Sequence, residues 1–131
     1  MRFAKGVFLV AGIYGIIVLT PLYFLESFIG RMQPPAITHP EYFYGFVGVG
    51  LAWQVLFLIV GTDPARYRLM MIPSILEKLS YGVALLVLFS RQRIPLSVLE
   101  VGSGDWVFAI FFAAAFVATR PGNSIRSIQT E

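Results

Sequence analysis

Four apolar stretches, separated by short polar segments, make up most of this 131-residue chain. A helix needs about 20 apolar residues to cross the hydrocarbon of a bilayer. The pattern therefore predicts an all-α integral membrane protein, a four-helix bundle with antiparallel, up-down topology, in which residues 1–131 form a single transmembrane domain. The predicted spans cover about residues 3–26, 41–61, 67–90 and 103–120, and a polar tail follows at 121–131.

Local signals support these boundaries. The first run is longer than the roughly 7–15 residues of a signal-peptide core, and no small-residue cleavage site follows it, so we expect an uncleaved helix. Pro40 suits the first position of a helix, and Asp63 followed by Pro64 repeats this start signal. Because the link between the second and third helices is so short, we expect them to be antiparallel neighbours. Pro73 interrupts the third helix, and two interpretations stay open. Residues 63–72 could lie at the interface while 73–90 enter the bilayer, or one helix kinked at Pro73 could run through 64–90, which is the interpretation we favour.

The fourth span is harder to delimit. The Gly102-Ser103-Gly104 run predicts a break, and Asp105 is suited to cap a helix over residues 105–119. That helix is short for a span, so residues 95–101 are expected to form a partial helix. Whether this segment crosses the outer leaflet or lies on it stays open.

Composition agrees with a membrane protein. The chain is 57% hydrophobic and 13% charged, whereas soluble domains carry about 25% charged residues. So little charge cannot cover a water-facing surface of this size. The absence of cysteine excludes disulfides and thiolate metal sites. A net charge of +3 comes from basic residues that are scattered rather than clustered, which argues against a nucleic-acid partner.

The basic residues also predict an orientation. The N-terminus, the 62–68 link and the C-terminal tail carry more Lys and Arg than the opposite side, which favours cytoplasmic N- and C-termini, with a bacterial cytoplasmic membrane as the expected location. The first side holds Arg2, Lys5, Arg66, Arg68, Arg120 and Arg126, and the other holds Arg31, Arg91 and Arg93.

Candidate chemistry centres on Glu77 and Lys78, in the stretch SILEKLSYG. Counting from the end of the third helix puts the pair roughly 10 Å inside the cytoplasmic boundary. Adjacent helical residues point about 100° apart, so we do not expect a mutual salt bridge. Lys78 could instead reach the headgroups, and Glu77 could pair with a cation from another helix. Tyr81 lies four residues further along the same helix face, where its hydroxyl could donate to Glu77. The pair is thus either a structural anchor or a ligand- or proton-binding site, with Gln54, Tyr81 and Tyr14 as further lining candidates.

Polar and small residues suggest how the helices pack. Gln54 lies near the middle of the second span, where we expect it to face protein and to bond across helices. Small residues let helix backbones approach closely in lipid, although they could also leave room for a flat pigment ring. The packing candidates are Gly12, Gly15, Gly45, Gly48 and Ala52.

Metal and cofactor chemistry finds little support. His39 is the only histidine, and its Thr-His-Pro-Glu setting predicts a cap or loop residue. It stays a weak candidate ligand for a pigment or within a symmetric dimer. No metal site and no cofactor are predicted, although pigment or lipid binding is possible, and no catalytic motif is present.

In size and number of helices the chain resembles the small multidrug resistance transporters. Those proteins carry an essential acid within the first helix, whereas the first span here has no acid, so their mechanism is not transferred. We expect a non-enzymatic accessory or structural subunit that packs against a larger membrane complex or against itself. The alternative is a proton-coupled carrier or intramembrane ligand binder that uses Glu77; an intramembrane lipid enzyme has the least support.

Overall fold

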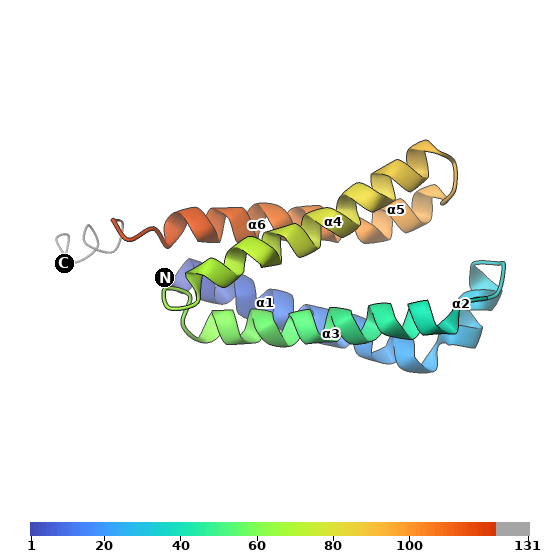
Figure 1. The fold of residues 1–131 in the computed structure, drawn as a ribbon, viewed down its shortest axis with the longest axis horizontal. Helices are drawn as coiled ribbons and strands as arrows, with labels where there is room; N and C mark the ends of the chain where they lie inside the picture. The colour runs from blue at the N-terminus through green and yellow to red at the C-terminus, as the bar shows by residue number, and fades with distance from the viewer. Residues whose placement is uncertain (123–131) are drawn as a thin grey trace.

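The computed structural model describes residues 1–122, and within them the chain is helical, with no strand. Figure 1 shows the long helices lying along one common direction, with the chain reversing at each end. The helices are α1 (Arg2–Leu19, continued by a 3-10 turn over Thr20–Phe24), α2 (Glu26–Met32), α3 (Pro40–Thr62), α4 (Met71–Ser90, preceded by a 3-10 turn over Arg68–Met70), α5 (Leu96–Gly102) and α6 (Gly104–Ala118).

Four segments are long and apolar enough to cross a bilayer, which confirms the prediction of an all-helical chain with four candidate spans. Each has 23 residues, a length of about 35 Å at 1.5 Å per residue, against hydrocarbon about 30 Å thick. Large apolar side chains on all four stay exposed, as a lipid-facing surface requires. The segments are Arg2–Phe24, Pro40–Thr62, Arg68–Ser90 and Leu96–Ala118.

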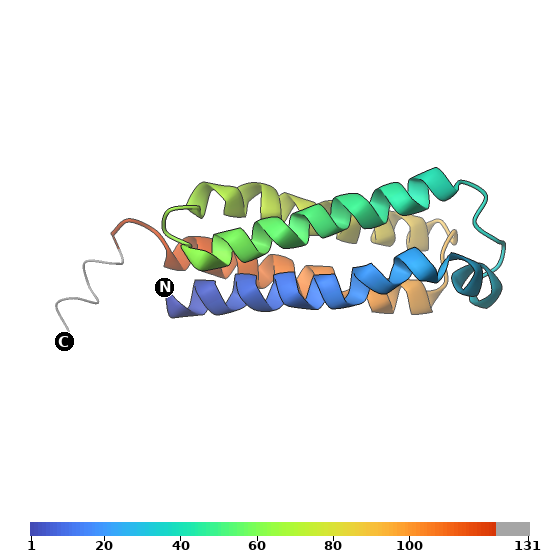
Figure 2. The ribbon, with the colours of Figure 1, turned by 90° about the horizontal axis from the view of Figure 1, so that it is seen from below.

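The long helices pack as two pairs. α1 lies against α3 and α4 lies against α6, while α1 and α6 join the two pairs. α3 and α4 are consecutive and are joined by a short link, yet they make few contacts with each other. In Figure 1, α3 and α4 are close at the link that joins them and diverge toward the other end of the molecule. Figure 2 shows the same helices from below. The expectation of close neighbours therefore holds near the link only.

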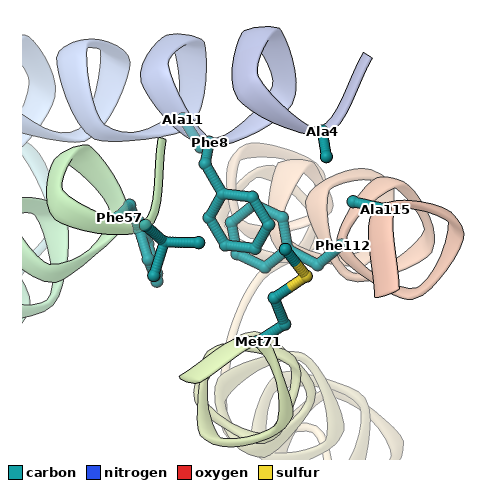
Figure 3. Packing of buried hydrophobic residues seen from close by; sticks show 8 residues of the cluster. Ala4, Phe8, Ala11, Phe57, Met71, Phe112 and Ala115 are labelled. Atoms are coloured by element: carbon teal, nitrogen blue, oxygen red, sulfur yellow. The ribbon is translucent and has the colours of Figure 1, made fainter. Parts of the chain in front are cut away.

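Aromatic rings form the core where α1, α3 and α6 meet. Phe8 stacks on Phe112 with ring centroids 4.3 Å apart, and Phe57 meets Phe112 edge-on at 4.9 Å. Met71 from α4 closes the cluster (Figure 3). All four side chains are fully buried, so this cluster is the point at which the two helix pairs are held together.

The predicted break before α6 is present as an interruption at Ser103, which separates α5 (Leu96–Gly102) from α6 (Gly104–Ala118) without turning the chain back. Ser103 has helical backbone angles (φ −64°, ψ −20°), and its N–H bonds to the carbonyl of Glu100. α5 and α6 therefore continue as one apolar segment. Gly102 is small because the side chain of Leu85 lies against it, not because the chain turns there. The start of α6 has no side-chain cap, so Asp105 is not a capping residue.

Pro73 lies in the first turn of α4, directly after the 3-10 turn. At this position the missing N–H removes no essential helical bond. A kink at Pro73 stays a prediction, as does the division of the chain into a single domain. Of the predicted polar tail, residues 123–131 lie outside the described residues.

Two of the predicted packing glycines let α1 and α3 approach closely. A Cβ added at Gly12 would lie 2.9 Å from the backbone carbonyl oxygen of Gln54, and one added at Gly15 would overlap the Gln54 side chain. Gly48 lies beside Tyr23, since a Cβ added at Gly48 would be 3.2 Å from the Tyr23 hydroxyl oxygen. By contrast, Gly45 has nothing within 4 Å and Ala52 is exposed. Neither of these two packs against another described helix.

Gly12→Ala is expected to destabilise the protein by roughly 1–2 kcal/mol, because the new methyl group meets backbone that cannot move aside cheaply. Gly6→Ala is the matched control, since Gly6 lies on the same helix with nothing within 4 Å. Alanine there should be neutral or slightly stabilising. The measurement is loss of helicity on titration with dodecyl sulfate in mixed micelles. Equal effects at the two positions would contradict the close α1–α3 contact.

Candidate functional site

Lys78 occupies the centre of a cluster of charges inside the helices. Its side chain is buried, with the residue 7% exposed. The Lys78 ammonium donates to Oδ1 of Asp105 on α6 at 3.2 Å and lies 3.4 Å from Oε2 of Glu77. It also lies 5.3 Å from the ring centre of Phe57 and 5.8 Å from that of Phe108, at cation–π distance. We refer to Glu77, Lys78 and Asp105 as the charged triad.

Two expectations for this pair are wrong. Glu77 and Lys78 do form a salt bridge, because the long lysine stem lets the ammonium lean back toward its neighbour. Lys78 also does not extend toward the headgroups. It lies one residue from the middle of the Arg68–Ser90 segment, and Asp105 lies two residues from the middle of Leu96–Ala118. Roughly 15 Å then separates the triad from either end of the span, too far for a lysine to bridge.

A groove opens between α3 and α4, where these helices separate. Its volume is about 550 Å³. Glu77 forms part of its wall, with 20% of the side chain exposed. Most of the remaining wall is apolar and aromatic. The groove is lined by Phe46, Val49, Trp53, Leu76 and Tyr81, among others.

Glu77 keeps unused capacity to accept hydrogen bonds. Its Oε2 is buried and accepts no hydrogen bond within the described residues, the Lys78 ammonium at 3.4 Å being its nearest charged neighbour. Tyr81, the predicted donor, makes no such bond in the part of the chain that the structure describes. Its ring instead lies 5.8 Å from that of Phe46, across the groove from α4 to α3.

The other predicted lining residues lie elsewhere. Gln54 is buried against Gly15 of α1, as expected for a residue that faces protein, but its amide donates to the carbonyl of Gly50 on its own helix at 3.0 Å. The expected bond across helices is therefore not the one formed. Tyr14 is half exposed on α1, with its ring 5.5 Å from that of Phe108. Neither side chain lines the groove.

His39 is exposed at the start of α3, where its Nδ1 lies 3.2 Å from Oε1 of Glu41. Its backbone carbonyl accepts from the first turn of the helix, as expected for a residue that precedes a helix. Within residues 1–122 no group of three or more His, Cys, Asp or Glu side chains could hold a metal ion.

The N-terminus and the link between α3 and α4 lie at the same end of the molecule (Figure 1). These two segments carry Arg2, Lys5, Arg66 and Arg68. Arg68 donates to the carbonyl of Phe116 at 3.1 Å, and its guanidinium lies 3.7 Å from the centre of that residue's ring. A cation at the end of α6 is favourable because the carbonyls there carry partial negative charge. Arg68 thus ties α6 to the segment that precedes α4.

The chain is therefore a small helical protein, compatible with a membrane protein, with a charged triad at the middle of its third and fourth candidate spans. No protein-family model, no curated protein and no solved structure matches it.

Proposed function

We propose that this chain is a non-enzymatic integral membrane protein that binds a small amphiphilic molecule in the α3–α4 groove, with Glu77 as the polar contact. The observation that carries this proposal is a carboxylate in the wall of an aromatic groove at mid-span depth. Ionisable side chains in lipid are costly, and those that persist usually mark ligand or ion sites.

The polar groups of the groove suit binding and release better than bond cleavage. Glu77 lies beside the Lys78 ammonium. The hydroxyl of Ser80 donates to the backbone carbonyl of Glu77 at 2.9 Å, so its proton is directed to the helix backbone and not to a side chain that could act as a base. A ligand that pairs with Glu77 competes with a proton for the same carboxylate. A proton-coupled carrier would use this competition, since protonation of Glu77 would release the ligand. The excess of basic residues at the end with the N-terminus supports cytoplasmic termini.

Filling the groove should remove the ligand. Val49→Trp adds a large ring to the groove wall at an exposed position, whereas Val55→Trp adds the same ring to an exposed position of α3 outside it. In native mass spectra of protein extracted from its host membrane, we expect a small-molecule adduct on the wild type and on Val55→Trp. The adduct should fall at least tenfold on Val49→Trp. An adduct that is equally abundant on both variants would refute groove binding.

A second candidate function is that of an accessory subunit, and one observation favours it. Gly45 and Ala52 lie seven residues apart on one face of α3, and within residues 1–122 no helix packs against them. Small residues spaced in this way allow another transmembrane helix to approach. The same mass spectra separate the two candidates, because a subunit carries a second protein chain or a second copy in fixed ratio. A small-molecule adduct on a single chain supports the binder.

A further inference from the structure

We propose that the molecule bound in the groove is an amphiphilic organic cation, with one ammonium group on an apolar body. This inference rests on the proposed binding function and adds the charge of the ligand. Glu77 is its counter-ion, and the aromatic walls of the groove hold the apolar body.

The charge balance of the triad gives the first argument. Two carboxylates, Glu77 and Asp105, share one ammonium group, that of Lys78. The triad in its ionised form therefore carries one net negative charge at mid-span depth. A negative charge in hydrocarbon is unfavourable unless a cation compensates it. A bound monocation would bring this charge to zero.

The geometry places the uncompensated charge on the groove side. The Lys78 ammonium makes a hydrogen bond to Asp105 at 3.2 Å, whereas its contact with Glu77 is a longer ion pair at 3.4 Å without a hydrogen bond. Asp105 does not line the groove, and Glu77 does. The carboxylate with the weaker compensation is thus the one that a molecule in the groove can reach.

The groove wall suits a cation next to its carboxylate. Phe46 and Tyr81 face each other with ring centres 5.8 Å apart, and Trp53 lies in the same wall. Aromatic faces attract ammonium groups, most strongly where water is excluded. Val49 and Leu76 provide the aliphatic surface that an alkyl chain needs.

The size of the groove favours a small molecule over a helix of another protein. Its lining residues extend from Phe46 to Trp53 on α3 and from Pro73 to Tyr81 on α4. Each of these stretches covers roughly 12 Å along the helix axis. A partner helix would contact this protein along a much larger part of a bilayer that is about 30 Å thick. A single alkyl chain with a charged head fits the shorter length.

Calorimetric titration of the full chain in phosphatidylcholine nanodiscs tests this inference, with empty nanodiscs as the background. The probes are decylamine, 1-decanol and decanoate, which share a chain length and differ in charge. The wild type should bind decylamine saturably and at least tenfold more tightly than decanol or decanoate. Glu77→Gln should lose at least tenfold for decylamine while binding of decanol is unchanged. Glu100→Gln is the matched control, because Glu100 is exposed and lies outside the groove.

The other outcomes separate the two proposals. If the wild type binds decanol as tightly as decylamine and Val49→Trp abolishes both, the groove binds amphiphiles but the charge inference is overturned. If no probe binds saturably and no native adduct is found, both proposals fail. Glu77→Asp keeps the negative charge and should keep the preference for decylamine over decanol. If Glu77→Asp loses this preference, the result counts against the inference. Where Glu77→Gln loses helicity, Val49→Trp, which leaves the triad intact, decides whether decylamine occupies the groove.

Discussion

Replacing Lys78 with methionine is expected to destabilise the protein by about 3–5 kcal/mol, the range for breaking a buried ion pair by removing one partner. The Lys78 ammonium lies between Glu77 and Asp105 and is the cation that both carboxylates contact. Methionine keeps much of the apolar stem but leaves the two acids facing each other without a cation. The cost is therefore electrostatic and does not come from lost volume.

Unfolding in mixed micelles on titration with dodecyl sulfate measures this loss. The decisive comparison puts Lys78→Met into a background that also carries Glu77→Gln and Asp105→Asn. There the substitution should cost little, because no uncompensated charge remains; replacing a whole buried ion cluster is often neutral. Lys5→Met is the control for removing a lysine at an exposed site of α1. The same large loss in both backgrounds would show that Lys78 acts through packing and not through its charge.

The helical spans could be predicted from the sequence because their signals are local. The length of each apolar run and the start signals at Pro40 and at Asp63-Pro64 depend on neighbouring residues only. The second helix, expected over 41–61, runs over Pro40–Thr62. The break expected at Gly102-Ser103-Gly104 does separate α5 from α6, but the local signal does not show the second role of Gly102. Here Gly102 makes room for Leu85, a contact that only the folded structure reveals.

Only part of the charged triad could be predicted from the sequence, because local signals do not show which residues meet across helices. An acid and a lysine within an apolar run identify Glu77 and Lys78, but their partner Asp105 lies 27 residues beyond Lys78 on α6. Next to a Gly-Ser-Gly run, Asp105 has the local setting of a helix cap, and this local signal hides its tertiary role. The signal that could have found it is the depth of the residue. Once Leu96–Ala118 is taken as a single span, Asp105 lies near its middle and requires a cation.

The groove could not be predicted from the sequence at all. A short link forces two helices to be close at one end, and it leaves their crossing angle free. Which helices pack along their whole length is decided by shape, such as Gly12 and Gly15 of α1 against Gln54 of α3. α3 packs along its length against α1, and α4 packs against α6. The faces of α3 and α4 that border the groove therefore make few contacts with each other.

Phe112→Ala is expected to cost about 2–3 kcal/mol, the second-largest effect, which is less than the 3–5 kcal/mol typical for this change in soluble proteins. Phe112 is fully buried and lies between Phe8 and Phe57. In water-soluble proteins part of the cost comes from transfer of the ring out of water. When membrane helices separate, the ring stays in hydrocarbon, and only its packing contacts are lost.

Phe111→Ala is the matched control, because Phe111 is the adjacent residue on α6 and is 44% exposed. A side chain that faces lipid in both the packed and the separated helix should change the free energy of unfolding by less than about 0.5 kcal/mol. Dodecyl sulfate titration in mixed micelles measures both variants. If Phe112→Ala and Phe111→Ala cost the same, the aromatic cluster does not hold the two helix pairs together. If instead Phe112→Ala costs 3–5 kcal/mol, the ring enters water on unfolding, and α6 leaves the hydrocarbon when the helices come apart.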